Sequence, residues 1–193
     1  MTFNDRASTL SLLTSRRSGK ARDMVAPGPD ADELAAMLAA AMRVPDHGKL
    51  APWRFVVVAA GARAALEAAL VESYTAEKPE AGRAELEAMR SFAHHAPCLI
   101  VLMARLREES HIPLWEQQLS VGAAAMQLLN AGHALGYVGN WLTGWPAYSE
   151  AVAARLGEAG ERVAGFFFFG TAAKPLEERP RPEPGAVVRH WTG

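Results

Sequence analysis

The sequence predicts an α+β or mixed α/β protein in which a sheet is buried between helices. Three observations support this prediction. Four apolar runs bounded by Pro or Gly are typical of buried strands, Ala- and Leu-rich segments separate them, and two such segments precede the first run. The length of 193 residues suits a single domain, 1–193, of which about 172–193 form an extended C-terminal arm.

The first predicted helix covers residues 4–15. Asn4 or Asp5 would cap it, because their side-chain oxygens can accept the free N–H groups of the first turn. A second helix begins at Asp30 with a D-x-x-E capping box, and Pro45 ends it. The apolar side of the first helix consists of Leu10, Leu12 and Leu13.

Apolar runs and their boundaries predict the remaining elements. Four consecutive phenylalanines in 162–171 indicate a strand buried on both faces, and Pro113 and Gly136 begin and end a long helix. The Pro-rich tail after residue 171 has little core, so we expect it to lie extended over this chain or a partner. The other predicted elements are strands over 53–60, 98–104 and 137–144 and helices over 62–76, 80–93 and 147–157.

Composition excludes several classes of protein. The chain has 20 basic and 21 acidic residues, and this balance argues against nucleic-acid binding, which usually requires a basic excess. A single cysteine cannot form an internal disulfide. No apolar run approaches the roughly 20 residues of a membrane span, and the first residues lack the apolar centre of a signal peptide. We therefore expect a cytoplasmic protein that does not bind membranes.

Three segments could carry chemistry. The first is Arg16-Arg17-Ser18, because guanidinium forks and a hydroxyl match the oxygens of a phosphate. The alternative is a solvated basic turn that suits the end of a helix. The second segment runs from Arg43 to Lys49, and His47 in it could titrate near neutral pH or donate to a ligand. Its alternative is a connector stiffened by proline.

The third segment, Gly136–Gly144, is rich in glycine. Its glycines do not form G-x-G-x-x-G, and they follow a helix where a dinucleotide fingerprint opens one. Glycines here would still let a flat ring approach the backbone. His94 and His95 lack the neighbours of a zinc site, so we predict no bound metal. Cys98 lies in a predicted buried strand and is expected to be inert.

Four motifs occur in a recognisable order and together resemble the FMN-dependent nitroreductase family, in particular its short, YdjA-like branch. They are R-R-S, A-x-R-x-P-D-H-x-x-x-x-P-W-x-F, W-E-Q-x-x-S-x-G and G-x-x-x-x-W-x-x-G, and the resemblance spans about residues 6–172. It implies a nitroreductase-like α+β fold with a mostly antiparallel sheet, and a homodimer with two FMN molecules at the interface. It also implies ping-pong reduction, in which NADH or NADPH reduces FMN and a nitroaromatic or quinone-like acceptor reoxidises it.

The resemblance also implies roles for individual residues. Arg16, Arg17 and Ser18 would hold the FMN phosphate and ribityl chain, and Lys20 would lie near the flavin pyrimidine. Of three basic residues on the arm, Lys174, Arg179 and Arg181, we choose Arg181 as a second phosphate ligand. The other implied FMN contacts are Arg43, His47, Trp141, Leu142 and Thr143, with loop 45–49 reaching the flavin of the other subunit. The implied nicotinamide-nucleotide segment is Ala131, Gly132, His133, Ala134, Leu135 and Gly136.

The implied chemistry agrees with the residue types. Flavin reduction places negative charge on the N1–C2=O edge, which a nearby Arg, Lys or His stabilises, so the protein needs no nucleophile of its own. Larger members have Asn and Gln where this chain has Lys49 and Ala51, so flavin contacts there differ. Two alternatives remain: a flavin-binding protein that stores FMN, destroys flavin or removes halogen, and a non-enzymatic helical interaction protein.

Overall fold

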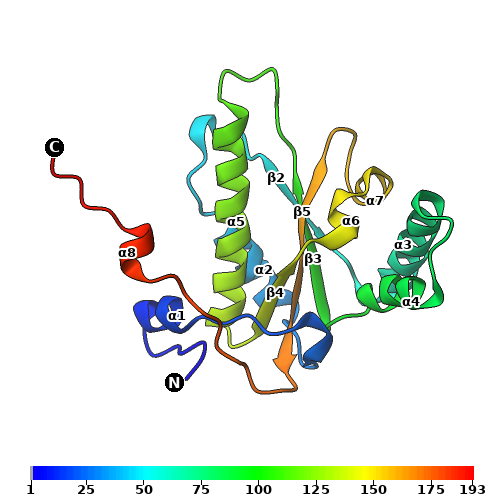
Figure 1. Ribbon diagram of the computed structural model, residues 1–193, viewed down its shortest axis with the longest axis horizontal. Helices are drawn as coiled ribbons and strands as arrows, with labels where there is room; N and C mark the ends of the chain where they lie inside the picture. The colour runs from blue at the N-terminus through cyan, green and yellow to red at the C-terminus, as the bar shows by residue number, and fades with distance from the viewer. Residues whose placement is uncertain (1) are drawn as a thin grey trace.

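A five-stranded antiparallel sheet organises the protein, which we describe from a computed structural model covering residues 2–193 (Figure 1). The strand order is β1-β5-β3-β2, and β4 pairs with β5 beside β1. Every pair is antiparallel, which confirms the predicted α+β class. The strands are β1 (Met24–Val25), β2 (Trp53–Val57), β3 (Cys98–Ala104), β4 (Val138–Leu142) and β5 (Arg162–Ala172).

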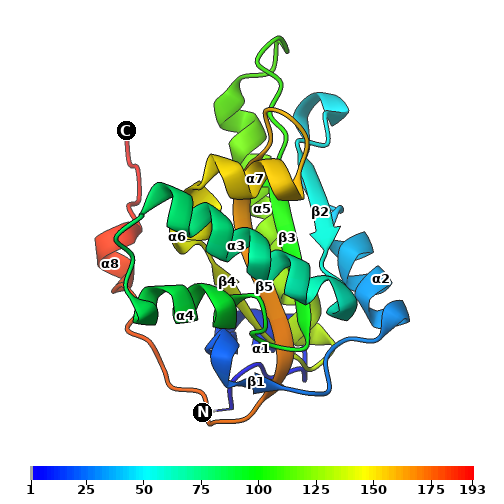
Figure 2. The same ribbon diagram turned by 90° about the vertical axis from the view of Figure 1, so that its right-hand side faces the viewer.

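Helices cover both faces of the sheet (Figures 1 and 2). One face packs against α2 and α5, and the other against the layer formed by α3, α4, α6 and α7. No helix within residues 2–193 has both the length and the apolar character needed to cross a bilayer. The helices are α1 (Thr9–Ser15), α2 (Ala31–Ala41), α3 (Arg63–Glu77), α4 (Arg83–Phe92), α5 (Leu114–Ala134), α6 (Gly144–Tyr148), α7 (Glu150–Leu156) and α8 (Pro184–Val187).

The four phenylalanines of β5 fill the core on both sides of the sheet. Phe166 and Phe168 belong to the cluster under α3, α4 and α7, whereas Phe167 and Phe169 belong to the cluster under α2 and α5. All four are fully buried, as predicted. Fully burying a phenylalanine stabilises a fold by roughly 1.5–3 kcal/mol. Because two of the four rings lie on each face, β5 contributes hydrophobic stabilisation to both layers.

Most predicted elements are confirmed, with shifted ends. The first helix was predicted too long and with the wrong cap: it begins at Thr9, and the Ser8 side chain accepts from the backbone N–H of Ser11 at 3.0 Å. Of its three leucines only Leu12 is buried. The capping box at Asp30 is present, but that helix ends at Ala41, before Pro45.

Short elements were missed or merged. The predicted helix over 147–157 is two helices, because Ser149 caps α7 with its side chain and ends α6. The two-residue strand β1 and the single turn α8 were not predicted. The arm after β5 is exposed over almost its whole length, and only Leu176 in it is half-buried against the core. The arm therefore adds little to the core of this chain, as expected.

The C-terminal end of α5 packs closely on the sheet. A Cβ added at Gly132 would lie 2.5 Å from Cε1 of Phe169, so only glycine allows this approach. The next residue, His133, is fully buried, and its Nδ1 lies 3.1 Å from the carbonyl oxygen of Tyr137. Gly136 then ends the helix with φ +99°, a conformation that favours glycine.

We predict that Gly132→Ala destabilises the protein. Alanine favours the helix by about 1 kcal/mol over glycine, but its Cβ forces the Phe169 ring to move in a packed core. Overpacking of this kind costs about 1–3 kcal/mol, so we expect a net fall in the free energy of urea unfolding. The matched control is Gly61→Ala, whose Cβ has no atom within 4 Å. Unchanged or increased stability of Gly132→Ala would contradict the close packing.

We also predict that His133 makes stability depend on pH. Burial is the main cause that lowers the pKa of His133 to about 4; the hydrogen bond to the Tyr137 carbonyl oxygen opposes this shift, and the Arg16 charge adds to it. In the unfolded chain this imidazole has a pKa near 6.5, so between these values the unfolded chain binds a proton that the folded chain does not. The free energy of unfolding then falls by on the order of 3 kcal/mol as the pH falls through this window.

The measurement for His133 is urea unfolding between pH 4 and pH 7. His133→Gln lacks the titrating group, and its carboxylates titrate as in the wild type. The wild type should therefore lose more stability than the variant over this range. Parallel curves for the two proteins would show that His133 is not held neutral by burial.

Candidate functional site

Three arginines gather where α1 ends and the C-terminal arm returns to the body. Arg16 Nη1 donates to Ser18 Oγ at 3.1 Å, and Arg181 Nη2 donates to the carbonyl oxygen of Arg16 at 3.3 Å. Burial, followed by the charges of Arg181 and Arg17, lowers the pKa of Arg16. Within residues 2–193 no carboxylate forms an ion pair with Arg16 or Arg17. We call Arg16, Arg17, Ser18 and Arg181 the arginine cluster.

The backbone of the cluster is fixed by a residue that sequence reasoning placed in another role. Asn4, predicted as a helix cap, accepts from the Arg17 N–H at 2.8 Å and donates to the Arg17 carbonyl oxygen at 3.1 Å. Arg17 Nε in turn donates to the Glu177 carbonyl oxygen at 2.5 Å, which ties the arm to the cluster. Asn4 has a φ of +53°, which is unusual except for Gly, Asn and Asp. This left-handed backbone shows that Asn4 lies in a turn and not at the start of a helix.

Strand β4 lies beside this segment. The Asn140 side chain donates to the Gly19 carbonyl oxygen, and Gly19 fits against Val138 with no room for a Cβ. One residue on, Trp141 stacks on Phe167 at 5.2 Å between ring centroids, and its indole N–H donates to the Ala164 carbonyl oxygen at 3.1 Å. The Trp141 side chain stays 40% exposed, so a flat aromatic surface is available near the arginine cluster.

The other predicted residues near the cluster differ in accessibility. Lys20 is exposed, whereas Leu142 and Thr143 are half-buried at the end of β4. In the segment 131–136, Gly132 and His133 are buried and only the last three residues are exposed. Half-buried Ala131 and exposed Ala134, Leu135 and Gly136 are therefore the accessible residues of this segment, whereas the side chain of His133 faces the core.

Arg43 and His47 lie at the opposite end of α5. Residues 45–49, which we call the His47 loop, pass the first turn of this helix (Figure 1). There His47 Nδ1 lies 2.6 Å from Glu116 Oε2. From Glu116 to Ala134 the helix rises by roughly 27 Å at about 1.5 Å per residue. The arginine cluster lies at the other end, as the effect of Arg16 on the pKa of His133 indicates. The structure thus brings the first and third predicted segments together and keeps the second apart.

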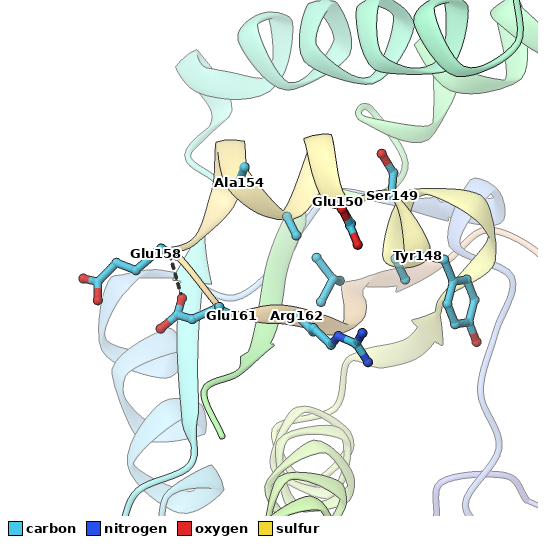
Figure 3. A pocket seen from close by; sticks show the side chains of 12 residues that line it. Tyr148, Ser149, Glu150, Ala154, Glu158, Glu161 and Arg162 are labelled. Carbon is cyan, nitrogen blue, oxygen red and sulfur yellow. Dashed lines mark hydrogen bonds between the residues drawn. The ribbon is translucent and has the colours of Figure 1, made fainter. Parts of the chain in front are cut away.

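A separate cavity of about 680 Å³ opens between α6, α7 and the start of β5 (Figure 3). Tyr148, Glu150 and Arg162 line it, together with Glu158 and Glu161, which are joined by a 3.0 Å hydrogen bond from the Glu158 backbone N–H. None of the predicted site residues lines this cavity. The cavity was not anticipated from the sequence, because its lining comes from helix ends and turns without a motif.

Neither a metal centre nor a reactive cysteine emerges from the side chains. Over residues 2–193, no three His, Cys, Asp or Glu side chains gather closely enough to hold a metal ion. Burial raises the pKa of Cys98 to about 11, although the nearby Arg63 charge opposes this. A thiol with such a pKa is almost fully protonated at neutral pH and is a poor nucleophile.

Comparisons with known proteins identify sequences and a family similar to this chain. The profile of the nitroreductase family matches residues 13–171. YdjA of Escherichia coli (strain K12), which is named as an NAD(P)H nitroreductase, is 33% identical over 163 residues, or 84% of this chain and 87% of YdjA. A protein of Haemophilus influenzae with the same named activity is 34% identical over 178 residues, or 89% of this chain and 92% of its own length.

A solved structure agrees with the fold. The nitroreductase-like family protein of Bacillus cereus superposes with a TM-score of 0.83 at 20% identity, and the match covers 100% of this chain and 99% of that one. The family profile spans the arginine cluster up to Ser18, the His47 loop, α5 and β4, so the motifs and the fold point to the same group of proteins. The chain belongs to the nitroreductase family.

Proposed function

We propose that the protein is an FMN-dependent NAD(P)H oxidoreductase that passes electrons to a small acceptor, such as a nitroaromatic or quinone-like compound, by a ping-pong mechanism. The arginine cluster carries this proposal. Its guanidinium groups act on one another unfavourably, and within residues 2–193 only that of Arg181 meets a carboxylate, that of Glu178 at 3.5 Å. An exposed tryptophan of the neighbouring strand β4, Trp141, stacks on Phe167. Such a donor set suits a ligand with a phosphate at one end and a flat ring at the other.

FMN fits these residues. Arg16, Arg17 and Arg181 would bind its phosphate, and Ser18 can donate its hydroxyl hydrogen while accepting from Arg16. Trp141, Leu142 and Thr143 would border the ring, with Lys20 on the exposed side. Bound FMN supplies the hydride and electron transfer, which no side chain could perform. FMN is bound in a nitroreductase structure from Desulfovibrio desulfuricans, which shares 21% identity and a TM-score of 0.71 with this chain.

A homodimer would complete the site. Arg43 and His47 lie roughly 27 Å along α5 from the arginine cluster, beyond the reach of side chains in one chain. A two-fold axis across α5 makes the partner's α5 antiparallel, and so brings the partner's His47 loop beside this chain's arginine cluster. We therefore propose that each FMN is held by two chains.

Exposed apolar side chains support the dimer. Trp115 and Leu119 of α5 are 67% and 53% exposed, and Leu10 and Leu13 of α1 are exposed near the other end of α5. In an antiparallel pair, each of these patches faces the other on the partner, and both would be buried. The arm also carries exposed apolar residues that would cover the partner, namely Val187, Val188 and Trp191.

Residues of two chains would then share the reaction. Arg43 and His47 would stabilise the negative charge that reduction places on the flavin N1–C2=O edge. The exposed residues Ala134, Leu135 and Gly136 are proposed to contact the nicotinamide nucleotide. An acceptor would enter after the oxidised nucleotide leaves, as a ping-pong mechanism requires.

The visible spectrum of the purified protein tests this proposal first, followed by NAD(P)H oxidation with an added nitroarene. We expect the spectrum of a bound flavin that proves to be FMN after release from the protein. We also expect NAD(P)H oxidation that depends on the acceptor. A protein that binds FMN but does not oxidise NAD(P)H would favour a storage, flavin-destroying or dehalogenating role. A colourless protein that does not bind added FMN would overturn the proposal in favour of a non-enzymatic interaction protein.

We predict that Arg16→Ala weakens FMN more than riboflavin. A charge-assisted hydrogen bond is worth about 1.5–3 kcal/mol, so FMN affinity should fall roughly tenfold to a hundredfold. Riboflavin lacks the phosphate and should bind almost as before. Fluorescence titration of both flavins measures the difference, and Arg179→Ala is the control because it removes a guanidinium from the same arm. Equal losses for the two ligands would show that Arg16 does not contact the phosphate.

A further inference from the structure

The first turns of α5 hold the His47 loop from one side. Glu116 Oε2 lies 2.6 Å from His47 Nδ1, and Ser120 Oγ donates to the Pro45 carbonyl oxygen at 2.6 Å. Glu116 and Ser120 are four residues apart and therefore lie on the same side of the helix. Glu116 and Ser120 are two of the four specified residues of the motif W-E-Q-x-x-S. Their role is to hold the His47 loop, and the sequence alone did not reveal it.

Gln117 anchors the segment that precedes α5. Its buried amide donates to the carbonyl oxygens of Arg107 and Ile112 at 3.0 and 2.9 Å, and accepts from the Arg107 N–H at 2.9 Å. Ile112 in turn packs under Gly48, where an added Cβ would lie 3.0 Å from Ile112 Cγ1. The His47 loop is thus supported both by α5 and by the segment that leads into it.

The loop backbone is unusual. Lys49 and Ala51 have φ values of +54° and +46°, and a left-handed conformation costs a residue with a Cβ about 1–2 kcal/mol. The Asp46 carboxylate holds this conformation by accepting from the N–H groups of Leu50 at 3.2 Å and Ala51 at 2.8 Å. Strained backbone that side chains maintain is typical of functional sites.

The contact between His47 and Glu116 contributes little to the free energy of unfolding. Their side chains are 64% and 42% exposed, and an exposed ion pair of this kind contributes about 0–1 kcal/mol. What the contact determines is the direction of the imidazole ring. Because Nδ1 is engaged by the carboxylate, Nε2 is the nitrogen left for a ligand, and no hydrogen bond to it comes from residues 2–193.

We propose that Glu116 is a positioning residue, which turns His47 so that Nε2 faces the N1–C2=O edge of FMN held by the other protomer. This inference rests on the proposed function. In its doubly protonated form, His47 would donate Nδ1–H to Glu116 and Nε2–H to the flavin. Ser120 fixes the position of the His47 loop along α5 through its hydrogen bond to the Pro45 carbonyl oxygen. Glu116 acts through His47 and does not itself touch the flavin.

The midpoint potential of bound FMN tests the inference in a double-mutant cycle. In Glu116→Ala, affinity for reduced FMN should fall about tenfold more than affinity for oxidised FMN, which for two electrons is about 30 mV towards lower potential. Glu116→Gln keeps an acceptor oxygen and should recover part of this shift. In a His47→Ala background, Glu116→Ala should have no further effect, because the residue acts through His47.

A second measurement needs no flavin. Nitrogen-15 NMR of the imidazoles in flavin-free protein should show hydrogen on Nδ1 of His47 in the wild type, and a loss of this preference in Glu116→Ala. The matched control is Glu109→Ala, which removes an exposed carboxylate from the segment before α5. Urea unfolding should show that the variants remain folded.

Each outcome is decisive. If wild-type protein binds FMN but Glu116→Ala keeps the wild-type potential, or if its effect persists without His47, the positioning role is wrong while the proposed function stands. If Glu109→Ala shifts the potential as much, a general charge effect replaces the inference. A wild type that binds no FMN overturns the proposed function, and this inference with it.

Discussion

The packing of β5 determines where everything else lies. Phe169 presses against Gly132 of α5 and Gly139 of β4, and neither glycine leaves room for a Cβ. This contact holds the C-terminal end of α5 close to the sheet and next to β4. The segment after α1 is bonded to β4 through Asn140 and is held by Asn4, so the position of the arginine cluster depends on this close hydrophobic contact.

A second constraint follows from the first. Because α5 is a continuous helix of 21 residues, its two ends hold two sets of polar groups that one chain cannot bring together. The arginine cluster is at one end, and the His47 loop with Glu116 is at the other. A two-fold partner overcomes this separation without any movement inside a chain. The length of α5 and the proposed dimer are therefore parts of one account.

The sequence allowed the main elements to be predicted because their signals are local. Four phenylalanines between turn residues, and a long helix between Pro113 and Gly136, are visible without tertiary information. β1 has only two residues, and its partner Ala172 is 148 positions from Met24, so no local pattern reveals it. The same holds for the contact between His47 and Glu116, which are 69 residues apart.

The site was predicted less completely than the fold. The arginine motif suggested a phosphate site and the resemblance suggested Arg181 from the arm, and in the structure Arg181 donates to the carbonyl oxygen of Arg16. The family resemblance placed His133 at a nucleotide site, but the side chain faces the core, because its side of α5 packs on the sheet. Asn4 resembled a helix cap because asparagine favours both caps and left-handed turns.

Subunit complementation tests most directly whether each site is built from two chains. Arg16→Ala and His47→Ala chains are coexpressed with different tags, and the hybrid dimer is purified through both. A shared site predicts that the hybrid has one doubly substituted site and one intact site, so it binds one FMN with wild-type affinity per dimer. A site built within one chain would leave every site with one substitution, and the absence of any wild-type-affinity site in the hybrid would contradict the account.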